Sequence, residues 1–129
     1  GNHGYSHQHH NNLNLDGNRK EILDTEKVIE AETGIKTTLF APPYGEFNDT
    51  TLQAADSLGY RTIMWSIDTI DWKRDGKEKI LQRVMKNPHN GALILMHPTE
   101  DTVTVLPVII GKLQELGYHI GTVSDAIQG

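Results

Sequence analysis

The sequence predicts a mixed α/β fold in which parallel strands are joined and covered by helices. Two observations support this: short apolar runs rich in β-branched residues recur along the 129 residues, and amphipathic segments with helix-capping residues separate them. Strands that alternate with helices at this rhythm pack in parallel with right-handed crossovers. No low-complexity linker or strong internal repeat interrupts the pattern, so we expect a single domain over residues 1–129.

The first predicted elements are a helix and a strand. Residues 16–34 are expected to form the helix, with a polar cap at Asp16 or Asn18 and a glycine at its end. Residues 35–41 are rich in β-branched side chains and predict a strand. The two prolines and the glycine in residues 42–48 then predict a rigid turn.

The same order of helix and strand recurs along the rest of the chain. Helices are expected at residues 48–59, 76–87 and 104–117, and strands at residues 60–67, 91–97 and 118–123. Asn48 can cap the first of these helices. The last helix has an apolar side formed by Leu106, Ile109, Ile110, Leu113 and Leu116. A short tail over residues 124–129 follows the last strand.

Charge and composition exclude several classes of partner. The net charge is −5 and there is no long basic run, which argues against nucleic acid as the main partner. No apolar run approaches the roughly 20 residues of a membrane span. Because the chain has no cysteine, any metal must be held by His, Asp or Glu.

The opening stretch holds four of the seven histidines: His3, His7, His9 and His10. His3 and His7 are four residues apart, which on a helical turn points both imidazoles the same way and offers two nitrogens to one metal. This spacing also fits a solvated loop or an expression-tag remnant, although the interleaved Gly, Tyr, Ser and Gln are unlike a tag. His9 and His10 are interpreted as exposed loop residues.

Groups able to do chemistry follow three predicted strands, where sites form in parallel α/β folds. They are Pro42, Pro43 and Tyr44, then Asp68, Asp71 and Trp72, and finally His97. Asp71 is equally well explained as a helix cap or a solvent-facing residue. His97 ends an otherwise apolar run, where a polar ring needs a partner. We expect Asp68 to be that partner, and a purely structural histidine is the alternative.

Four stretches in this order, "NHGYSH", "APPYG", "DTIDW" and "LMH", resemble the polysaccharide deacetylase family, the NodB-homology carbohydrate esterases. The resemblance covers essentially the whole chain and corresponds to the later, larger part of the family's domain. It implies a distorted (β/α) barrel, here a partial one that lacks its first strands. It also implies a divalent metal, usually zinc, used to remove N-acetyl groups from chitin-like or peptidoglycan sugars; some members cleave O-acetyl esters from xylan.

The resemblance assigns roles to individual residues. His3 and His7 match the two histidine metal ligands, and the backbone N–H of Tyr44 matches the group that stabilises the oxyanion. His97 matches the general acid and Asp68 the residue that tunes it. The implied substrate contacts are Pro43, Trp72 in the groove and Leu95 in the acetyl pocket.

The sequence departs from the family pattern at three places. Gly4 stands where a hydroxyl residue is usual, and Ala41 stands where the family has an arginine. The Thr-Phe-Asp-Asp motif, which supplies the catalytic base and the third metal ligand, is not among the 129 residues and would lie before Gly1.

The resemblance therefore implies an N-deacetylase of acetylated amino-sugar polymers that acts outside the cell or at the cell wall. We expect the chain to be inactive alone, and its unpaired strand edges to favour association or segment exchange with another chain. One alternative is a degenerate, non-catalytic domain that binds glycan, with Gly4 and Ala41 as signs of drift. Another is a deacetylase that acts on a small acetylated molecule.

Overall fold

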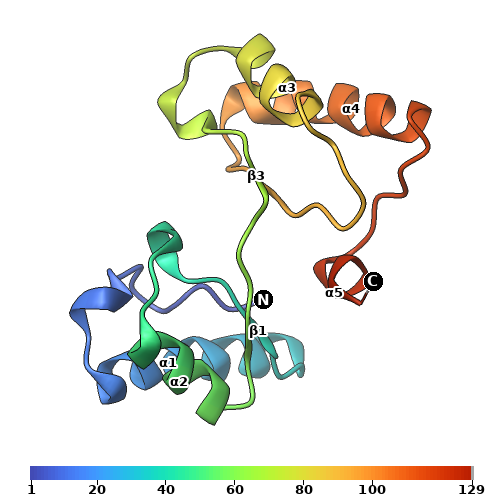
Figure 1. Ribbon diagram of the computed structural model, residues 1–129. Helices are drawn as coiled ribbons and strands as arrows, with labels where there is room; N and C mark the ends of the chain where they lie inside the picture. The colour runs from blue at the N-terminus through green and yellow to red at the C-terminus, as the bar shows by residue number, and fades with distance from the viewer. Residues whose placement is uncertain (129) are drawn as a thin grey trace. The chain divides into compact units, whose positions relative to one another are not determined.

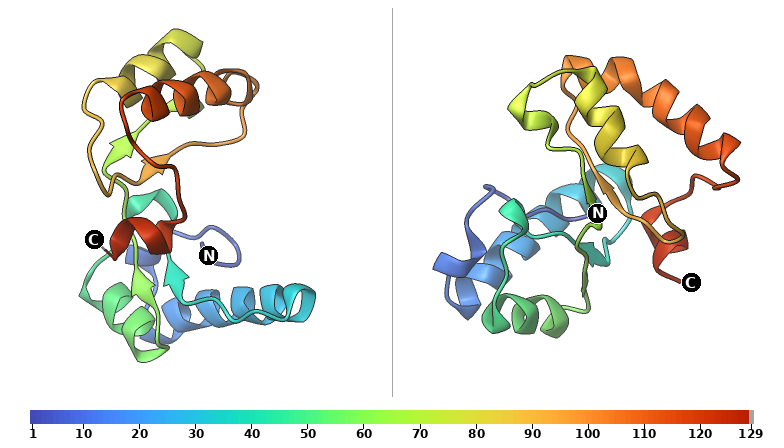
Figure 2. Two further views of the ribbon diagram at one scale, coloured as in Figure 1. Left: turned by 90° about the vertical axis from the view of Figure 1, so that its right-hand side faces the viewer. Right: turned by 45° about the horizontal axis from the view of Figure 1, so that its top comes forward.

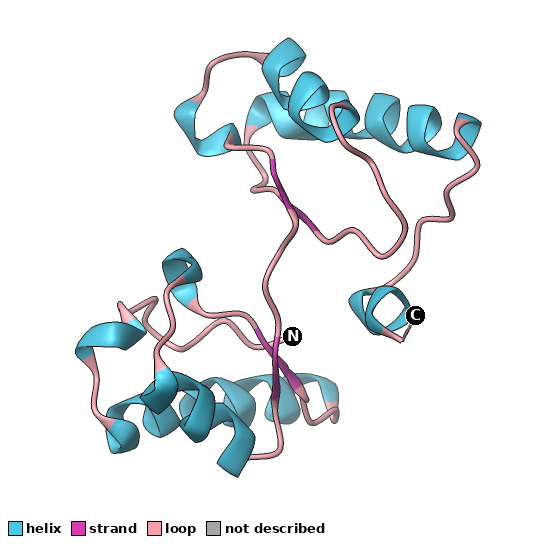
Figure 3. Cartoon of the chain, viewed as in Figure 1, coloured by secondary structure: helices cyan, strands magenta, loops and turns pink. Residues whose placement is uncertain are grey.

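Two pairs of short parallel strands organise the chain, and each pair belongs to its own compact unit. The computed structural model describes residues 1–128, which divide into a first unit ending at Met64 and a second unit beginning at Trp65. In the first unit β1 (Leu39–Phe40) pairs with β2 (Arg61–Thr62), and in the second β3 (Ile67–Asp68) pairs with β4 (Ile94–Leu95) (Figure 3). Parallel strands alternating with helices confirm the predicted α/β class, and within residues 1–128 they form no closed barrel.

The first unit contains two α-helices that lie side by side (Figures 1 and 2). The first, α1 (Leu15–Thr33), begins one residue before the expected range, because Asn14 rather than Asp16 or Asn18 caps it: the Asn14 side chain accepts a hydrogen bond from the Gly17 N–H. It ends as predicted, with Gly34 in the left-handed conformation at φ 73°.

The second helix of this unit, α2 (Asp49–Ser57), has the predicted Asn48 cap, and Thr51 completes a capping box. The helices bury Ile22 and Ala55 against Phe40 of β1 and Tyr60, which form the apolar core of the unit. The start of the chain also pairs with β1. The Asn2 N–H donates to the Leu39 carbonyl, and the Ala41 N–H donates to the Asn2 carbonyl.

The strand expected over residues 60–67 is instead divided between two ladders. Its first part pairs with β1 as β2, and its last residue belongs to β3, which pairs with β4. Met64 and Trp65 lie between the two ladders, at the boundary of the two units. The apolar run was recognisable in the sequence, but the change of strand partner within it was not.

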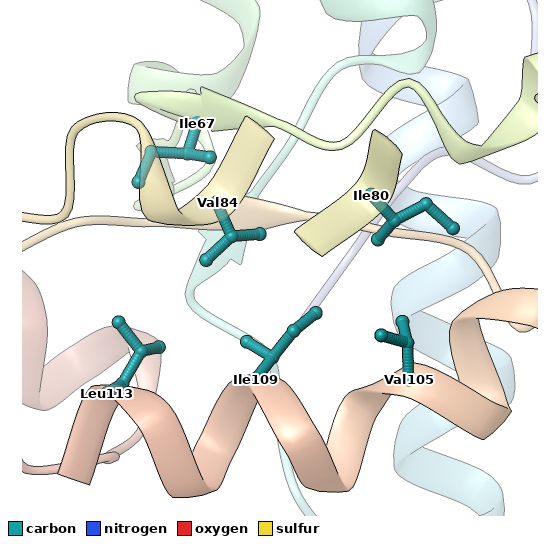
Figure 4. Packing of buried hydrophobic residues seen from close by; sticks show 6 residues of the cluster. All are labelled: Ile67, Ile80, Val84, Val105, Ile109 and Leu113. Atoms are coloured by element: carbon teal, nitrogen blue, oxygen red, sulfur yellow. The ribbon is translucent and has the colours of Figure 1, made fainter. Parts of the chain in front are cut away.

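The second unit is organised by α3 (Lys77–Met85) and α4 (Glu100–Glu115), which pack together (Figures 1 and 4). The predicted helix over residues 104–117 begins four residues earlier, because the Thr99 side chain accepts a hydrogen bond from the Thr102 N–H. Figure 4 shows side chains of the two helices and of β3 facing one another: Ile67, Ile80, Val84, Val105, Ile109 and Leu113.

The prediction of a strand over residues 118–123 is wrong. No strand among residues 1–128 pairs with this segment, and an unpaired strand would leave its backbone groups without partners. Residues 118–122 form neither helix nor strand, and α5 (Val123–Ile127), with a capping box formed by Thr122 and Asp125, follows in the stretch expected to be a short tail. None of the helices in the described residues is both long and apolar enough to cross a bilayer.

The contrast between two isoleucines of the second unit tests this packing. Ile109 is 2% exposed and Ile120 is 51% exposed. Ile109→Ala is expected to lower the free energy of unfolding by about 2–5 kcal/mol, because it removes buried methylenes and leaves a cavity. Ile120→Ala is expected to cost less than about 0.5 kcal/mol.

Urea denaturation followed by tryptophan fluorescence measures this difference selectively, because both tryptophans, Trp65 and Trp72, belong to the second unit. Equal losses of stability in the two variants would contradict the core described for this unit.

Candidate functional site

The first unit brings three aromatic side chains of the predicted site together. The ring centroids of His3 and His7 are 5.0 Å apart, and those of His7 and Tyr44 are 4.7 Å apart. All three side chains are exposed. The two imidazoles that the sequence singled out therefore lie next to each other and next to the tyrosine.

The environment of His3 selects the tautomer of its ring. Its Nδ1 lies 2.6 Å from the carbonyl oxygen of Ala41. Because a carbonyl only accepts, Nδ1 carries the proton and donates, which leaves the lone pair of Nε2 available. Because the acceptor is the backbone of residue 41, this contact does not depend on the side chain there, which is alanine in place of the family's arginine.

The loop carrying His3 and His7 is fixed by a buried asparagine that sequence analysis did not select. Asn2 is 2% exposed; its side-chain amide donates to the Ile22 carbonyl, and its Oδ1 accepts the Gly4 N–H at 3.0 Å. Gly4 has φ 79°, and an added Cβ would lie 3.2 Å from His10 Nε2. The backbone conformation and the close approach of His10 both favour glycine here.

The interpretation of His10 as an exposed loop residue is wrong. Its ring is completely buried, packs against Phe40, and donates through Nδ1 to Asn18 Oδ1 at 2.6 Å. Its Nε2 has no hydrogen-bond partner among the described residues. Asn18, expected as a possible helix cap, is buried as the partner of this ring. A polar stretch gives no signal that one of its histidines turns inward.

His9 is exposed, as expected, but it contacts a predicted site residue. Its ring stacks on that of Tyr44 with centroids 3.7 Å apart and planes 5° from parallel, and its Nδ1 lies 3.0 Å from Glu46 Oε2. Sequence analysis missed this contact because it joins residues far apart in the chain.

Tyr44 adopts a backbone conformation that is rare for a residue with a side chain. It lies in a 3-10 turn over Pro43–Gly45 with φ 61° and ψ 4°, in the left-handed region. Such a conformation costs on the order of 1–3 kcal/mol and recurs at functional positions. The buried Pro42 and Pro43 restrict the approach to this turn, so the rigid loop predicted from the sequence is present.

The donor set of the first unit fits part of a metal site. Imidazole nitrogens are common zinc ligands, and His3 and His7 offer two of them from neighbouring positions. Within residues 1–128, however, no group of three or more His, Cys, Asp or Glu side chains is arranged to hold a metal ion. The described residues thus offer two imidazole donors, fewer than a metal site requires.

In the second unit the partner of His97 is Asp71, so the expectation of Asp68 is wrong. His97 Nδ1 lies 2.8 Å from Asp71 Oδ1, and the His97 backbone N–H donates to Asp71 Oδ2. Thr102 donates its hydroxyl to the same Oδ2 at 2.8 Å. Asp68 Oδ1 instead accepts the Ile70 N–H at 2.9 Å, which stabilises the turn after β3.

The surroundings of Asp71 keep its carboxylate ionised. The side chain is 1% exposed, and this burial alone would raise the pKa of the carboxyl. The hydrogen bonds from the backbone and ring of His97 and from the Thr102 hydroxyl outweigh it, and the pKa of Asp71 lies below its ordinary value. An ionised Asp71 holds the proton on His97 Nδ1, and the ring itself is half exposed.

The predicted substrate contacts occupy different environments. Trp72 is 59% exposed in a 3-10 helix over Asp71–Lys73, and Lys73 Nζ lies 5.8 Å from the centroid of its ring. Leu95 is partly buried on β4, and Pro43 is buried in the first unit. An exposed indole offers the kind of flat apolar surface on which sugar rings can stack.

Comparison with known proteins gives consistent matches. A model of the polysaccharide deacetylase family matches residues 1–63. The uncharacterised protein YlxY of Bacillus subtilis is 37% identical over 97% of this chain and 39% of its own length. A peptidoglycan-N-acetylglucosamine deacetylase of Bacillus cereus is 32% identical over 99% of this chain and 48% of its own. The peptidoglycan-N-acetylmuramic acid deacetylase PdaC of B. subtilis is 36% identical over 97% of this chain and 26% of its own length.

Solved structures match over nearly the whole chain. BA3943 of Bacillus anthracis, described as a CE4 family pseudoenzyme, superimposes with a TM-score of 0.94 at 44% identity and covers 98% of this chain and 45% of its own. PdaC superimposes with a TM-score of 0.89 at 34% identity, and the match covers 99% of this chain and 62% of PdaC. A family 4 carbohydrate esterase of Streptomyces lividans gives a TM-score of 0.88 at 33% identity, and the match covers 94% of this chain and 63% of the esterase.

The chain therefore spans less than two thirds of each of these proteins. The resemblance noted from the four sequence stretches is confirmed, and so is the partial α/β fold. This chain corresponds to part of a polysaccharide deacetylase domain.

Proposed function

We propose that this chain is part of an enzyme that removes N-acetyl groups from amino-sugar polymers of the peptidoglycan or chitin type, at the cell wall or outside the cell. The observation that carries the proposal is the half-exposed His97 ring held by the buried, ionised Asp71. Such a pair is suited to deliver a proton to a leaving group. The relatives named as peptidoglycan deacetylases indicate the substrate class.

His3 and His7 would hold the divalent metal of this enzyme, and their nitrogen donors favour zinc. A bound divalent metal lowers the pKa of a coordinated water and polarises a carbonyl oxygen. The Asp-Asp motif of the family would supply the third ligand and the catalytic base, and it is not among the 129 residues. We assign these two carboxylates to another segment of the same polypeptide or to a segment exchanged from another chain.

The remaining roles follow from the chemistry of the side chains. His97 would protonate the leaving amine through Nε2, while Asp71 keeps Nδ1 protonated and stabilises the imidazolium form. The Tyr44 N–H would stabilise the negative charge that develops on the acetyl oxygen. Trp72 would stack on a sugar ring, and Leu95 and Pro43 would contact the acetyl group and the sugar.

A second candidate function is a non-catalytic domain that binds glycan. It is favoured by Gly4 and Ala41, which depart from the family pattern, and by the 44% identity to the pseudoenzyme BA3943. A mutant of that protein is described as having restored enzymatic activity, so mutation can convert a pseudoenzyme of this fold into an enzyme.

Acetate release distinguishes the two candidates. The intact gene product that contains this chain is expected to release acetate from N-acetylglucosamine oligomers, and His97→Ala is expected to lower the rate by about 10²–10⁴-fold, the range typical of general acid–base catalysis. His119→Ala, which changes an exposed histidine of the same unit, serves as the control.

Full activity in the His97→Ala protein would contradict the proposed role of this residue. Glycan binding without acetate release in the unmutated protein would instead support the non-catalytic domain. The 129-residue chain alone is expected to show no turnover, because it holds an acid but no base.

Zinc titration by calorimetry tests the metal ligands without reference to activity. His3→Ala and His7→Ala are each expected to weaken zinc binding by about tenfold or more, since each removes one of the two imidazole donors. His89→Ala, a histidine of the second unit, should leave the affinity unchanged. Equal zinc affinity in all four proteins would argue against the assignment.

The pH dependence of stability tests the choice of Asp71 over Asp68. Because the folded-state pKa of Asp71 is lowered, its contribution is fully present above the unfolded value of about 3.9 and is lost as the pH falls through the folded value. Asp71→Asn is expected to cost about 1–3 kcal/mol at pH 7, since it weakens hydrogen bonds to a buried charge. The difference from the wild type should shrink below about pH 4.

Asp68→Asn is the matched control. Asp68 is partly exposed and accepts one local N–H, a bond that an asparagine oxygen can also accept. Urea denaturation monitored by tryptophan fluorescence gives the free energy of unfolding of both variants. A larger loss at pH 7 from Asp68→Asn than from Asp71→Asn would reverse the assignment.

A further inference from the structure

Arg83, on the face of α3 near the turn that follows β3, contacts the backbone immediately before Asp71. Its Nη1 donates to the Thr69 carbonyl at 2.8 Å and reaches the Ile70 carbonyl at 3.4 Å. The same Nη1 and the neighbouring Nη2 together form a two-pronged ion pair with Asp75. Nothing in the sequence singles out this arginine, which lies within a predicted amphipathic helix.

The backbone that Arg83 contacts is strained. Ile70 has φ 50° and ψ 34°, in the left-handed region, which β-branched side chains strongly disfavour. The preceding Thr69 is completely buried, and its N–H and hydroxyl both donate to the Leu95 carbonyl. The planar guanidinium supplies a fixed donor to the Thr69 carbonyl and reaches the Ile70 carbonyl, which also accepts the Lys73 N–H at 3.1 Å.

This turn sets the direction of the Asp71 side chain. Asp71 begins a 3-10 helix directly after Ile70, and both of its oxygens are engaged by His97 and Thr102. If Ile70 relaxed to an extended or right-handed conformation, the chain would leave β3 in a different direction and Asp71 would no longer face the end of β4.

We propose that Arg83 is a positioning residue, which holds the left-handed turn at Ile70 and thereby keeps Asp71 oriented toward His97. The inference deepens the proposed function, because it rests on His97 as the general acid. The ion pair with Asp75 is made by Nη1 and Nη2 together and fixes the orientation of the guanidinium, while Nη1 also donates to the turn.

The test follows the Asp71–His97 contact directly, in the 129-residue chain. One readout is the ¹³C resonance of the Asp71 carboxyl as a function of pH, and the other is the exchange rate of the His97 amide hydrogen, which is bonded to Asp71. Arg83→Met is expected to raise the Asp71 midpoint toward that of an ordinary aspartate and to speed His97 amide exchange by tenfold or more. Lys79→Met, which removes another cation from α3, controls for the loss of charge.

Two further variants distinguish the effect of the guanidinium geometry from the effect of its charge and from a general loss of stability. Arg83→Lys keeps the charge but lacks the planar fork, so it should shift the Asp71 midpoint in the same direction as Arg83→Met. In an Ile70→Asn background the left-handed turn is much less strained, so Arg83→Met should there change both readouts less than in the wild type. Tryptophan fluorescence during denaturation identifies conditions in which every variant is folded.

Wild-type values of both readouts in Arg83→Met, or full retention of the wild-type midpoint in Arg83→Lys, would overturn the inference. Neither readout involves a substrate, so a chain without deacetylase activity can still bear the inference out. Conversely, normal acetate release after His97→Ala would refute the proposed function while leaving the structural link from Arg83 to Asp71 intact.

Discussion

The buried carboxylate of Asp71 is the interaction on which the second unit depends. It accepts from the end of β4 through the His97 backbone, from the His97 ring, and from Thr102 at the start of α4. One side chain thus joins the turn after β3 to the end of β4 and the start of α4, which lie 26 and 31 residues further along the chain. Because the group is almost fully buried, its charge is tolerated only while these donors remain in place. The orientation of the imidazole and the packing of α4 are therefore set by the same contacts.

The first unit uses an uncharged residue for a comparable purpose. Asn2 pairs its backbone with β1 on both sides of Phe40 and commits its side chain to Ile22 and Gly4. The loop that carries the two histidines is consequently anchored to the helix and to the strand ladder at once. The exposed rings of His3, His7 and Tyr44 rest on this anchored backbone, so their proximity does not depend on contacts among the rings alone.

The helices α1 to α4 were predictable from the sequence, whereas α5, the pairing of the strands and several contacts were not. Caps such as Asn48 and the terminal Gly34 are local signals, and they appear where expected. Strand pairing is a nonlocal property, so the division of residues 60–67 between two ladders had no signature in the apolar run. For the same reason Asp71 could not be chosen over Asp68: one ends β3 and the other lies three residues further on, and only the turn at Ile70 decides which one faces His97.

The contact between His3 and the Ala41 carbonyl has an evolutionary consequence. Because it is made by the main chain, mutation at position 41 can remove a charged group without disturbing the tautomer of the neighbouring imidazole. The side chain at position 41 can therefore vary in size and charge while the His3 ring keeps its orientation.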